Sequence, residues 1–146
     1  MKRVVLGFGL SLLFLTLSTS TYAQNNSAAG DDSSAVRATV TNYIEAYYTG
    51  DALRLEQTLH PHYMKHMIHG NIPMRDKTGA EMVQEVRSQG PSGQPQAERT
   101  EEVSVLDISG NIASAKLVTP HWVDYMTLSK LNGTWKILSV VQRIDN

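Results

Sequence analysis

The sequence predicts an α+β fold in which helices cover one face of a curved antiparallel sheet. Apolar residues recur at helical steps of three and four in the first half of the chain. From about residue 99 the spacing changes toward the alternation of strands, interrupted by hairpin turns. Because a chain of 146 residues with 41% apolar content can build a hydrophobic core, we expect one domain rather than a disordered chain.

The first 23 residues have the layout of a secretory signal peptide. Lys2 and Arg3 provide a positive start, Val4–Leu17 is apolar, and Ser18–Ala23 is small and polar, which predicts cleavage after Ala23. The apolar run of about 14 residues is shorter than the roughly 20 needed to span a bilayer. We therefore expect a periplasmic or secreted protein with no membrane insertion after cleavage.

Three helices are predicted in the first half of the domain, after a flexible leader at residues 24–33. Ser33 or Ser34 can cap the first helix, and Gly50 ends it because glycine readily adopts the left-handed conformation of a C-cap. Asp51 caps a shorter helix that ends before Pro61, and a Thr78–Glu81 capping box opens the third, which stops by Gly90. The first helix presents one apolar stripe, formed by Val36, Val40, Tyr43, Ile44 and Tyr47.

An antiparallel meander is predicted to complete the domain, which is expected over residues 34–146. A mobile loop at residues 90–97 precedes it, and Asn132-Gly133 is a strong hairpin signal. Residues 62–68 predict one further short strand, and residues 71–77 are expected to be a connection. The meander strands are expected at residues 99–108, 112–119, 121–131 and 134–144.

The composition excludes several classes of protein. With 13 Lys and Arg against 14 Asp and Glu, the formal charge of −1 argues against a nucleic-acid binder. Without Cys, the chain has no disulfide framework, thiolate metal site or Cys nucleophile. It contains neither the Gly-x-Ser-x-Gly elbow of hydrolases nor a phosphate-binding glycine loop. No cofactor is expected.

Four of the five histidines lie within residues 60–69. A metal site needs neutral imidazoles that converge on one ion. On a strand, His62 and His66 would share a face but lie two side-chain steps apart, and no acidic residue lies within the cluster. We therefore expect solvated or pocket-lining histidines at positions 60, 62, 66 and 69 rather than a metal site.

Three segments of the chain carry a resemblance to a known family. They are Tyr43–Asp51 (Tyr-Ile-Glu-Ala-Tyr-Tyr-Thr-Gly-Asp), Val123–Leu128 (Val-Asp-Tyr-Met-Thr-Leu) and Asn132–Ile137 (Asn-Gly-Thr-Trp-Lys-Ile). With them, Ser34–Ile144 resembles the nuclear-transport-factor-two-like superfamily, and is most similar to its putative lumazine-binding branch, near the SnoaL-like proteins. The resemblance implies a cone, that is, a strongly bent sheet wrapped by three helices. It also implies a pocket at the open end and a homodimer built through the outer sheet face.

The resemblance also implies a candidate oxyanion site. Ketosteroid isomerase, a member of the superfamily, has its oxyanion-hole Tyr and its protonated Asp at the places of Tyr43 and Asp124. On a period-two strand, Trp122, Asp124 and Met126 share one face, and burial among such neighbours raises the pKa of a carboxyl group. Tyr43 and Asp124 can then hold one carbonyl or enolate oxygen. Asp124 is expected to be hydrogen-bonded to Tyr43 or protonated.

The isomerase's carboxylate base has no counterpart in the stretch Met64–His69. His66 or His69 can replace it, since imidazole titrates near neutral pH. Three functions remain open: an exported binding protein, a lyase or isomerase, and a protein-interaction dimer. The binding protein would hold a small organic ligand against Tyr47, Trp122, Met126 and His69. The lyase or isomerase would use His66 as its base and Tyr43 with Asp124 as oxyanion donors.

Overall fold

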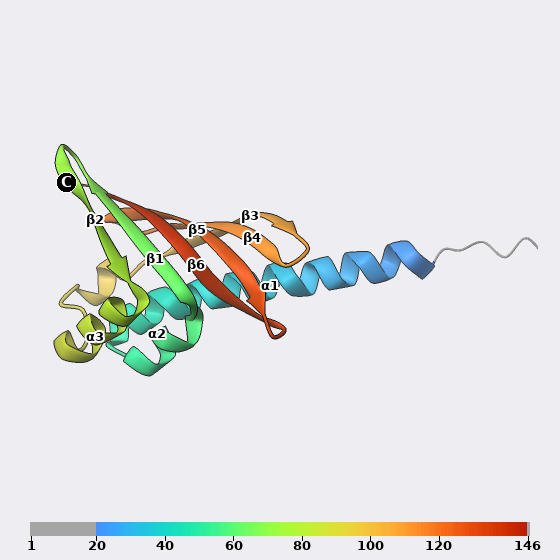
Figure 1. Cartoon of the computed structure of the whole chain (residues 1–146), viewed down its shortest axis with the longest axis horizontal. Coiled ribbons are helices and arrows are strands. Elements are labelled where there is room, and N and C mark those ends of the chain that lie inside the picture. The colour runs from blue at the N-terminus through green and yellow to red at the C-terminus, as the bar shows by residue number, and fades with distance from the viewer. Residues whose placement is uncertain (1–19, 146) are drawn as a thin grey trace, which may run out of the picture.

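The computed structural model describes the backbone of residues 20–145 and the side chains from residue 30 onward (Figure 1). Residues 1–19, which contain most of the predicted signal peptide, lie outside the described part. The helices are α1 (Ser20–Thr49), α2 (Ala52–Thr58), α3 (Gly79–Gln89) and the short 3₁₀ helix η1 (Gln96–Glu98). The strands are β1 (Leu59–His69), β2 (Ile72–Thr78), β3 (Glu102–Ser109), β4 (Ile112–Val118), β5 (Trp122–Leu131) and β6 (Thr134–Ile144).

The strands form one six-stranded sheet in the order β2-β1-β6-β5-β4-β3, with the helices on one of its faces (Figure 1). This confirms the predicted α+β class and the meander of β3 to β6. All neighbouring pairs are antiparallel except β1 and β6, which run parallel, so the sheet is mixed. The prediction of a wholly antiparallel sheet is therefore wrong for this one pair. Strand β6, the last of the meander, lies beside β1 and runs in the same direction.

Helix α1 begins earlier than the sequence pattern predicted. It includes residues 24–33, so the expected helix start at Ser33 or Ser34 is wrong. No proline interrupts this stretch, and the polar residues in it disfavour a helix by only tenths of a kcal/mol each, roughly. Asp32 also ties α1 to the β5–β6 hairpin, since its carboxylate accepts hydrogen bonds from Trp135 Nε1 at 3.0 Å and Lys130 Nζ at 2.5 Å.

Strand β2 occupies the stretch for which a connection was predicted. It pairs with β1 in antiparallel register, with Lys77 opposite Lys65. Because β2 is an edge strand and exposed along nearly its whole length, it lacks the apolar alternation that identifies a buried strand. Pro73 fits such an edge, where one row of backbone amides needs no partner.

The core lies between the helices and the concave face of the sheet. Of the predicted stripe of α1, Val36, Val40, Tyr43 and Ile44 are buried, and Tyr47 is half-buried. They face alternate residues of the central strands, including Leu117, Leu128 and Ile137. Two predicted features of the helix termini are confirmed: α1 ends before Gly50, which has φ +74°, and the capping box at Thr78 opens α3. No helix of the described residues is long and apolar enough to cross a membrane.

Candidate functional site

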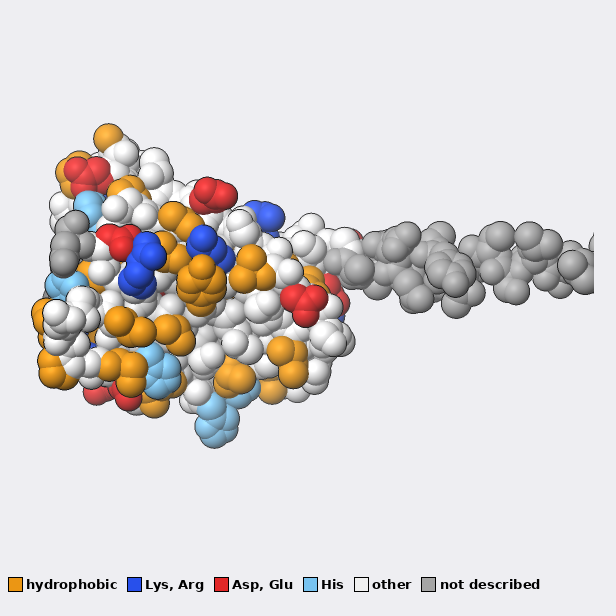
Figure 2. All heavy atoms as spheres, turned by 90° about the horizontal axis from the view of Figure 1, so that it is seen from above, with side chains coloured by type: hydrophobic (Ala, Val, Ile, Leu, Met, Phe, Trp, Pro, Cys, Tyr) orange, Lys and Arg blue, Asp and Glu red, His pale blue; other side chains and the backbone are white. Residues whose placement is uncertain are grey.

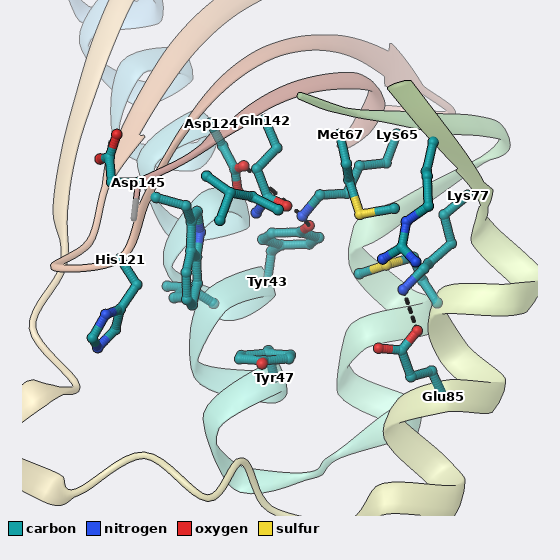
Figure 3. A pocket seen from close by; sticks show the side chains of 15 residues that line it. Tyr43, Tyr47, Lys65, Met67, Lys77, Glu85, His121, Asp124, Gln142 and Asp145 are labelled. Atoms are coloured by element: carbon teal, nitrogen blue, oxygen red, sulfur yellow. Dashed lines mark hydrogen bonds and ion pairs between the residues drawn. The ribbon is translucent and has the colours of Figure 1, made fainter. Parts of the chain in front are cut away.

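A cavity of about 270 Å³ lies between α1, α3 and the concave side of the sheet (Figure 3). Helix α1 contributes Tyr43 and Tyr47 to its wall. The inward-facing side chains of the strands complete it, with Lys65 from β1 and Asp124 from β5 at its inner end. The other lining residues are Ile44, Met67, Arg75, Lys77, Met82, Glu85, His121, Trp122, Gln142, Ile144 and Asp145.

The inner end of the pocket is a cluster of buried polar groups. Lys65, Asp124 and Gln142 meet above the hydroxyl of Tyr43 (Figure 3). The Lys65 side-chain nitrogen Nζ donates to Tyr43 Oη at 3.2 Å and lies 3.8 Å from Asp124 Oδ1. The hydroxyls of Tyr43 and Tyr63 are 3.3 Å apart. Neither oxygen of Asp124 has a hydrogen-bond partner in the described part of the chain.

Burial controls the charge state of this cluster. The side chain of Asp124 is completely buried, which raises the pKa of its carboxyl. The charge of Lys65, 3.8 Å away, lowers that pKa by a smaller amount, and the nearby N–H groups of Gln142 and Trp122 lower it further. Burial likewise lowers the pKa of Lys65 and raises that of Tyr43, so each of the three groups is pushed toward its neutral form.

Aromatic rings form a second wall of the cavity. Tyr47 from α1 and Trp122 from β5 contact each other edge to face, with ring centroids 5.8 Å apart and an interplanar angle of 88°. Both are partly exposed and line the pocket. This wall offers flat apolar surface to a ligand beside the polar inner end.

The mouth of the pocket carries charged side chains. Lys77 of β2 forms an ion pair with Glu85 of α3 (Figure 3). On the other side, His121 Nε2 lies 3.0 Å from Glu98 Oε2 in η1. The rim therefore presents both signs of charge to an entering molecule.

The structure brings together four of the residues that were predicted as site residues: Tyr43, Tyr47, Trp122 and Asp124. As expected, Asp124 is buried and faces inward from β5. Asp124 was expected to be either hydrogen-bonded to Tyr43 or protonated. That hydrogen bond is not among the contacts of the described residues, because Lys65 lies between the two groups, and burial raises the pKa of Asp124, which favours the protonated form. Met126 has the predicted parity, but it lies deeper on β5, in the core rather than in the pocket wall.

The two predicted histidines do not line the pocket. His66 neighbours Lys65 on β1, and successive residues of a strand point to opposite faces, so an inward Lys65 puts His66 outside. There its Nδ1 lies 2.6 Å from Asp76 Oδ1. His69 follows a register shift of β1 at Met67. The prediction that His66 or His69 lies in the pocket, as a base or as a ligand contact, is therefore wrong.

Among the lining residues that were not predicted, Lys65 is the buried ionisable one. The alternation of Tyr63, Lys65 and Met67 along one face of β1 was the available signal. It was overlooked because histidine titrates near neutral pH and lysine ordinarily does not. Within residues 30–145, no three His, Asp or Glu side chains are grouped so as to hold a metal ion.

Residues 31–142 match the family model described as putative lumazine-binding. The chain belongs to this family. Comparison with curated proteins finds no match. An NTF2-like protein of unknown function from Silicibacter pomeroyi shares 17% identity with this family member at a TM-score of 0.67, over 80% of this chain and 98% of its own.

Two further solved structures share the fold. An NTF2-like protein of unknown function from Shewanella baltica is 16% identical at a TM-score of 0.61, over 88% of this chain and 99% of its own. A ketosteroid isomerase-like protein from Erwinia carotovora is 12% identical at a TM-score of 0.57, over 80% of this chain and 98% of its own. At these identities the likeness establishes the NTF2-like fold for this putative lumazine-binding family member, and nothing finer.

Proposed function

We propose that this protein is an exported small-molecule-binding protein that holds a small organic ligand in the pocket between α1, α3 and the sheet. The observation that carries the proposal is the buried carboxyl of Asp124, which faces the pocket with neither oxygen hydrogen-bonded. A buried polar group without a partner costs about 1–3 kcal/mol. A ligand with a hydrogen-bonding edge would recover that energy.

The rest of the pocket supports a ligand that is small and partly aromatic. Ligand pockets commonly measure roughly 300–1,000 Å³, so a cavity of about 270 Å³ lies just below that range and suits a small ligand. Tyr47 and Trp122 offer aromatic surface to a flat ring, while Lys65 and Asp124 offer polar contacts to its edge. A fused heteroaromatic ring with carbonyl and N–H groups, as in lumazine, has both properties.

Binding is favoured over the two alternative functions. The lyase or isomerase hypothesis needs His66 within reach of Tyr43 and Asp124, and His66 instead pairs with Asp76 outside the pocket. A pure protein-interaction role predicts a cone that its own side chains fill. The open cavity supports a ligand-binding role instead.

The test is lumazine binding to the purified protein, measured by titration calorimetry. We expect Asp124→Asn, which keeps a donor and an acceptor, to retain binding. Asp124→Leu should weaken binding by roughly fivefold to a hundredfold, since a polar group of the ligand left buried without its partner costs about 1–3 kcal/mol. Asp107→Leu is the matched control, because Asp107 is an exposed residue of β3.

Two outcomes would contradict this proposal. Unchanged lumazine affinity in Asp124→Leu would remove Asp124 from the site. If the wild-type protein neither binds lumazine nor retains any compound from bacterial extract by mass spectrometry, the binding function is wrong.

Export is the second part of the proposal. It is supported by the positive, apolar and small-residue order of residues 1–23. Intact-mass analysis of the exported protein should give a chain that begins at Gln24. A soluble exported chain that retains Met1 would contradict cleavage.

We also propose that the protein is a homodimer through the outer face of the sheet. Tyr125 is 52% exposed there, and its cross-strand neighbour Val141 is 43% exposed. Figure 2 shows apolar side chains between charged ones on this side of the molecule. Since exposed large apolar side chains gather at interaction surfaces, a two-fold contact would cover them.

A further inference from the structure

We propose that Lys65 binds the carbonyl group of a ligand covalently, as an imine. This inference rests on the proposed binding function and adds a chemical class of ligand, namely small aromatic or conjugated aldehydes and ketones. It is carried by the position of the Lys65 amine at the inner end of the pocket, between Tyr43 and Asp124 (Figure 3).

The backbone holds this amine in place. Lys65 lies in the interior of the sheet, paired with Lys77 of β2 on one side and with Val140 of β6 on the other. Its side chain is only 7% exposed, yet it lines the cavity. A reactive group fixed in this way is already oriented toward a bound ligand, which favours reaction.

The hydrogen bonds around Lys65 favour a neutral amine. An ammonium group has three donors, and Lys65 makes one hydrogen bond among the described residues, to Tyr43 Oη. Asp124 has none, although it lies 3.8 Å away. Two buried charges with so few hydrogen bonds are unfavourable. Moving the proton from Lys65 to Asp124 removes both charges, so the neutral pair is favoured. A neutral lysine amine is a nucleophile.

The surrounding groups act in both directions on the pKa of Lys65. Burial lowers it most strongly, and Lys77 of β2 lowers it further. Asp124 of β5 and Glu85 of α3 raise it. Tyr43 of α1 and Gln142 of β6 face the amine as polar neighbours. The balance leaves the pKa below its ordinary value of 10.5.

The proposed step balances without an external reagent. The Lys65 nitrogen forms a bond to the carbonyl carbon as the C=O π bond opens. The oxygen takes a proton from the carboxyl of Asp124, and the nitrogen returns one of its two protons to that carboxylate, which gives a carbinolamine. Loss of that hydroxyl as water, with the remaining nitrogen proton, leaves a C=N bond. Asp124 in its protonated form, 3.8 Å from the Lys65 amine, is the acid of this step. Tyr43 holds its own proton because burial raises its pKa. Tyr47 and Trp122 suit a flat group attached to the carbonyl.

The experiment traps the imine by reduction. The purified protein is incubated with benzaldehyde and sodium cyanoborohydride at neutral pH, and the modified lysines are identified by peptide mass spectrometry. We expect Lys65 to be modified at least about tenfold faster than Lys116, because the pocket holds the aldehyde beside the Lys65 amine in an orientation that favours reaction. Burial also keeps a larger fraction of that amine neutral. Lys116 is a useful comparison because it lies outside the pocket, against the Tyr125 ring.

Variants separate this result from general lysine reactivity. Lys65→Arg should abolish the fast modification, and Lys116→Arg should leave it unchanged. Equal rates at Lys65 and Lys116 in the wild-type protein would overturn the proposal, and this comparison needs no variant to fold. Lumazine titration of the same wild-type sample tests the binding function separately. A protein that binds lumazine but leaves Lys65 unmodified contradicts only the imine.

Discussion

Replacing Gly50 with alanine should destabilise the protein more than any other glycine-to-alanine change in its turns. Gly50 ends α1 with φ +74°, and a Cβ atom there would lie 2.4 Å from both Gly90 C and Pro91 N. These atoms belong to the backbone that follows α3, so the contact cannot be relieved by a side-chain rotation. The same junction carries a hydrogen bond from Ser92 N to Tyr48 O at 3.2 Å. It therefore sets how α1 and α3 meet at the pocket.

Two contributions set the magnitude. The left-handed conformation costs a residue with a Cβ about 1–2 kcal/mol. Forcing an extra carbon into a packed site costs typically about 1–3 kcal/mol. Gly50→Ala should therefore lower the free energy of unfolding by about 2–5 kcal/mol, a large part of the roughly 5–15 kcal/mol of an ordinary domain.

Gly110 provides the matched control. It has φ +60° in the β3–β4 turn, and no heavy atom lies within 4 Å of its would-be Cβ. Gly110→Ala should then show only the conformational cost of about 1–2 kcal/mol. Urea denaturation followed by tryptophan fluorescence measures both variants against the wild type. Equal losses in the two variants would refute the argument that the Gly50–Gly90 contact is tight.

Three other perturbations test separate parts of the structure. Thr78→Ala removes the cap of α3 and should reduce stability by about 1 kcal/mol in thermal or urea unfolding, whereas no loss would contradict the capping box. Lys65→Met should be more destabilising at about pH 8 than at about pH 5. A lysine whose pKa is lowered in the folded state makes the protein more stable as the pH rises, and the variant loses this gain. Without Lys65, the pKa of Asp124 also rises further, so the folded variant loses more stability as the pH increases. A constant difference between the unfolding free energies at the two pH values would refute this. Tyr125→Asp should convert the proposed dimer to monomer in light scattering at micromolar concentration, and a wild-type protein that is already monomeric would contradict the dimer.

Parity along a strand decided which of the predicted site residues line the pocket. Asp124 could be placed in a pocket because a carboxyl between Trp122 and Met126 on the apolar face of β5 requires an explanation. The same rule, applied to β1, would have chosen Lys65 instead of His66. The sequence groups Tyr63, Lys65 and Met67 on one face of β1, but both faces carry polar residues, so only the packing of β1 in the sheet decided which of them turns inward.

The sequence by itself determined the local structure. Glycine at a helix end, a capping box at Thr78 and Asn132-Gly133 between two strands act through neighbouring residues, so their effect can be predicted without the rest of the fold. Only the tertiary structure decided the parallel pairing of β1 with β6, the edge strand β2 and the meeting of Lys65 with Asp124. The β1–β6 pairing and the meeting of Lys65 with Asp124 join residues far apart in the chain, and their energies depend on burial, which no local pattern specifies. Strand β2 follows β1 directly, but as an exposed edge strand it lacks the apolar alternation by which a strand is predicted.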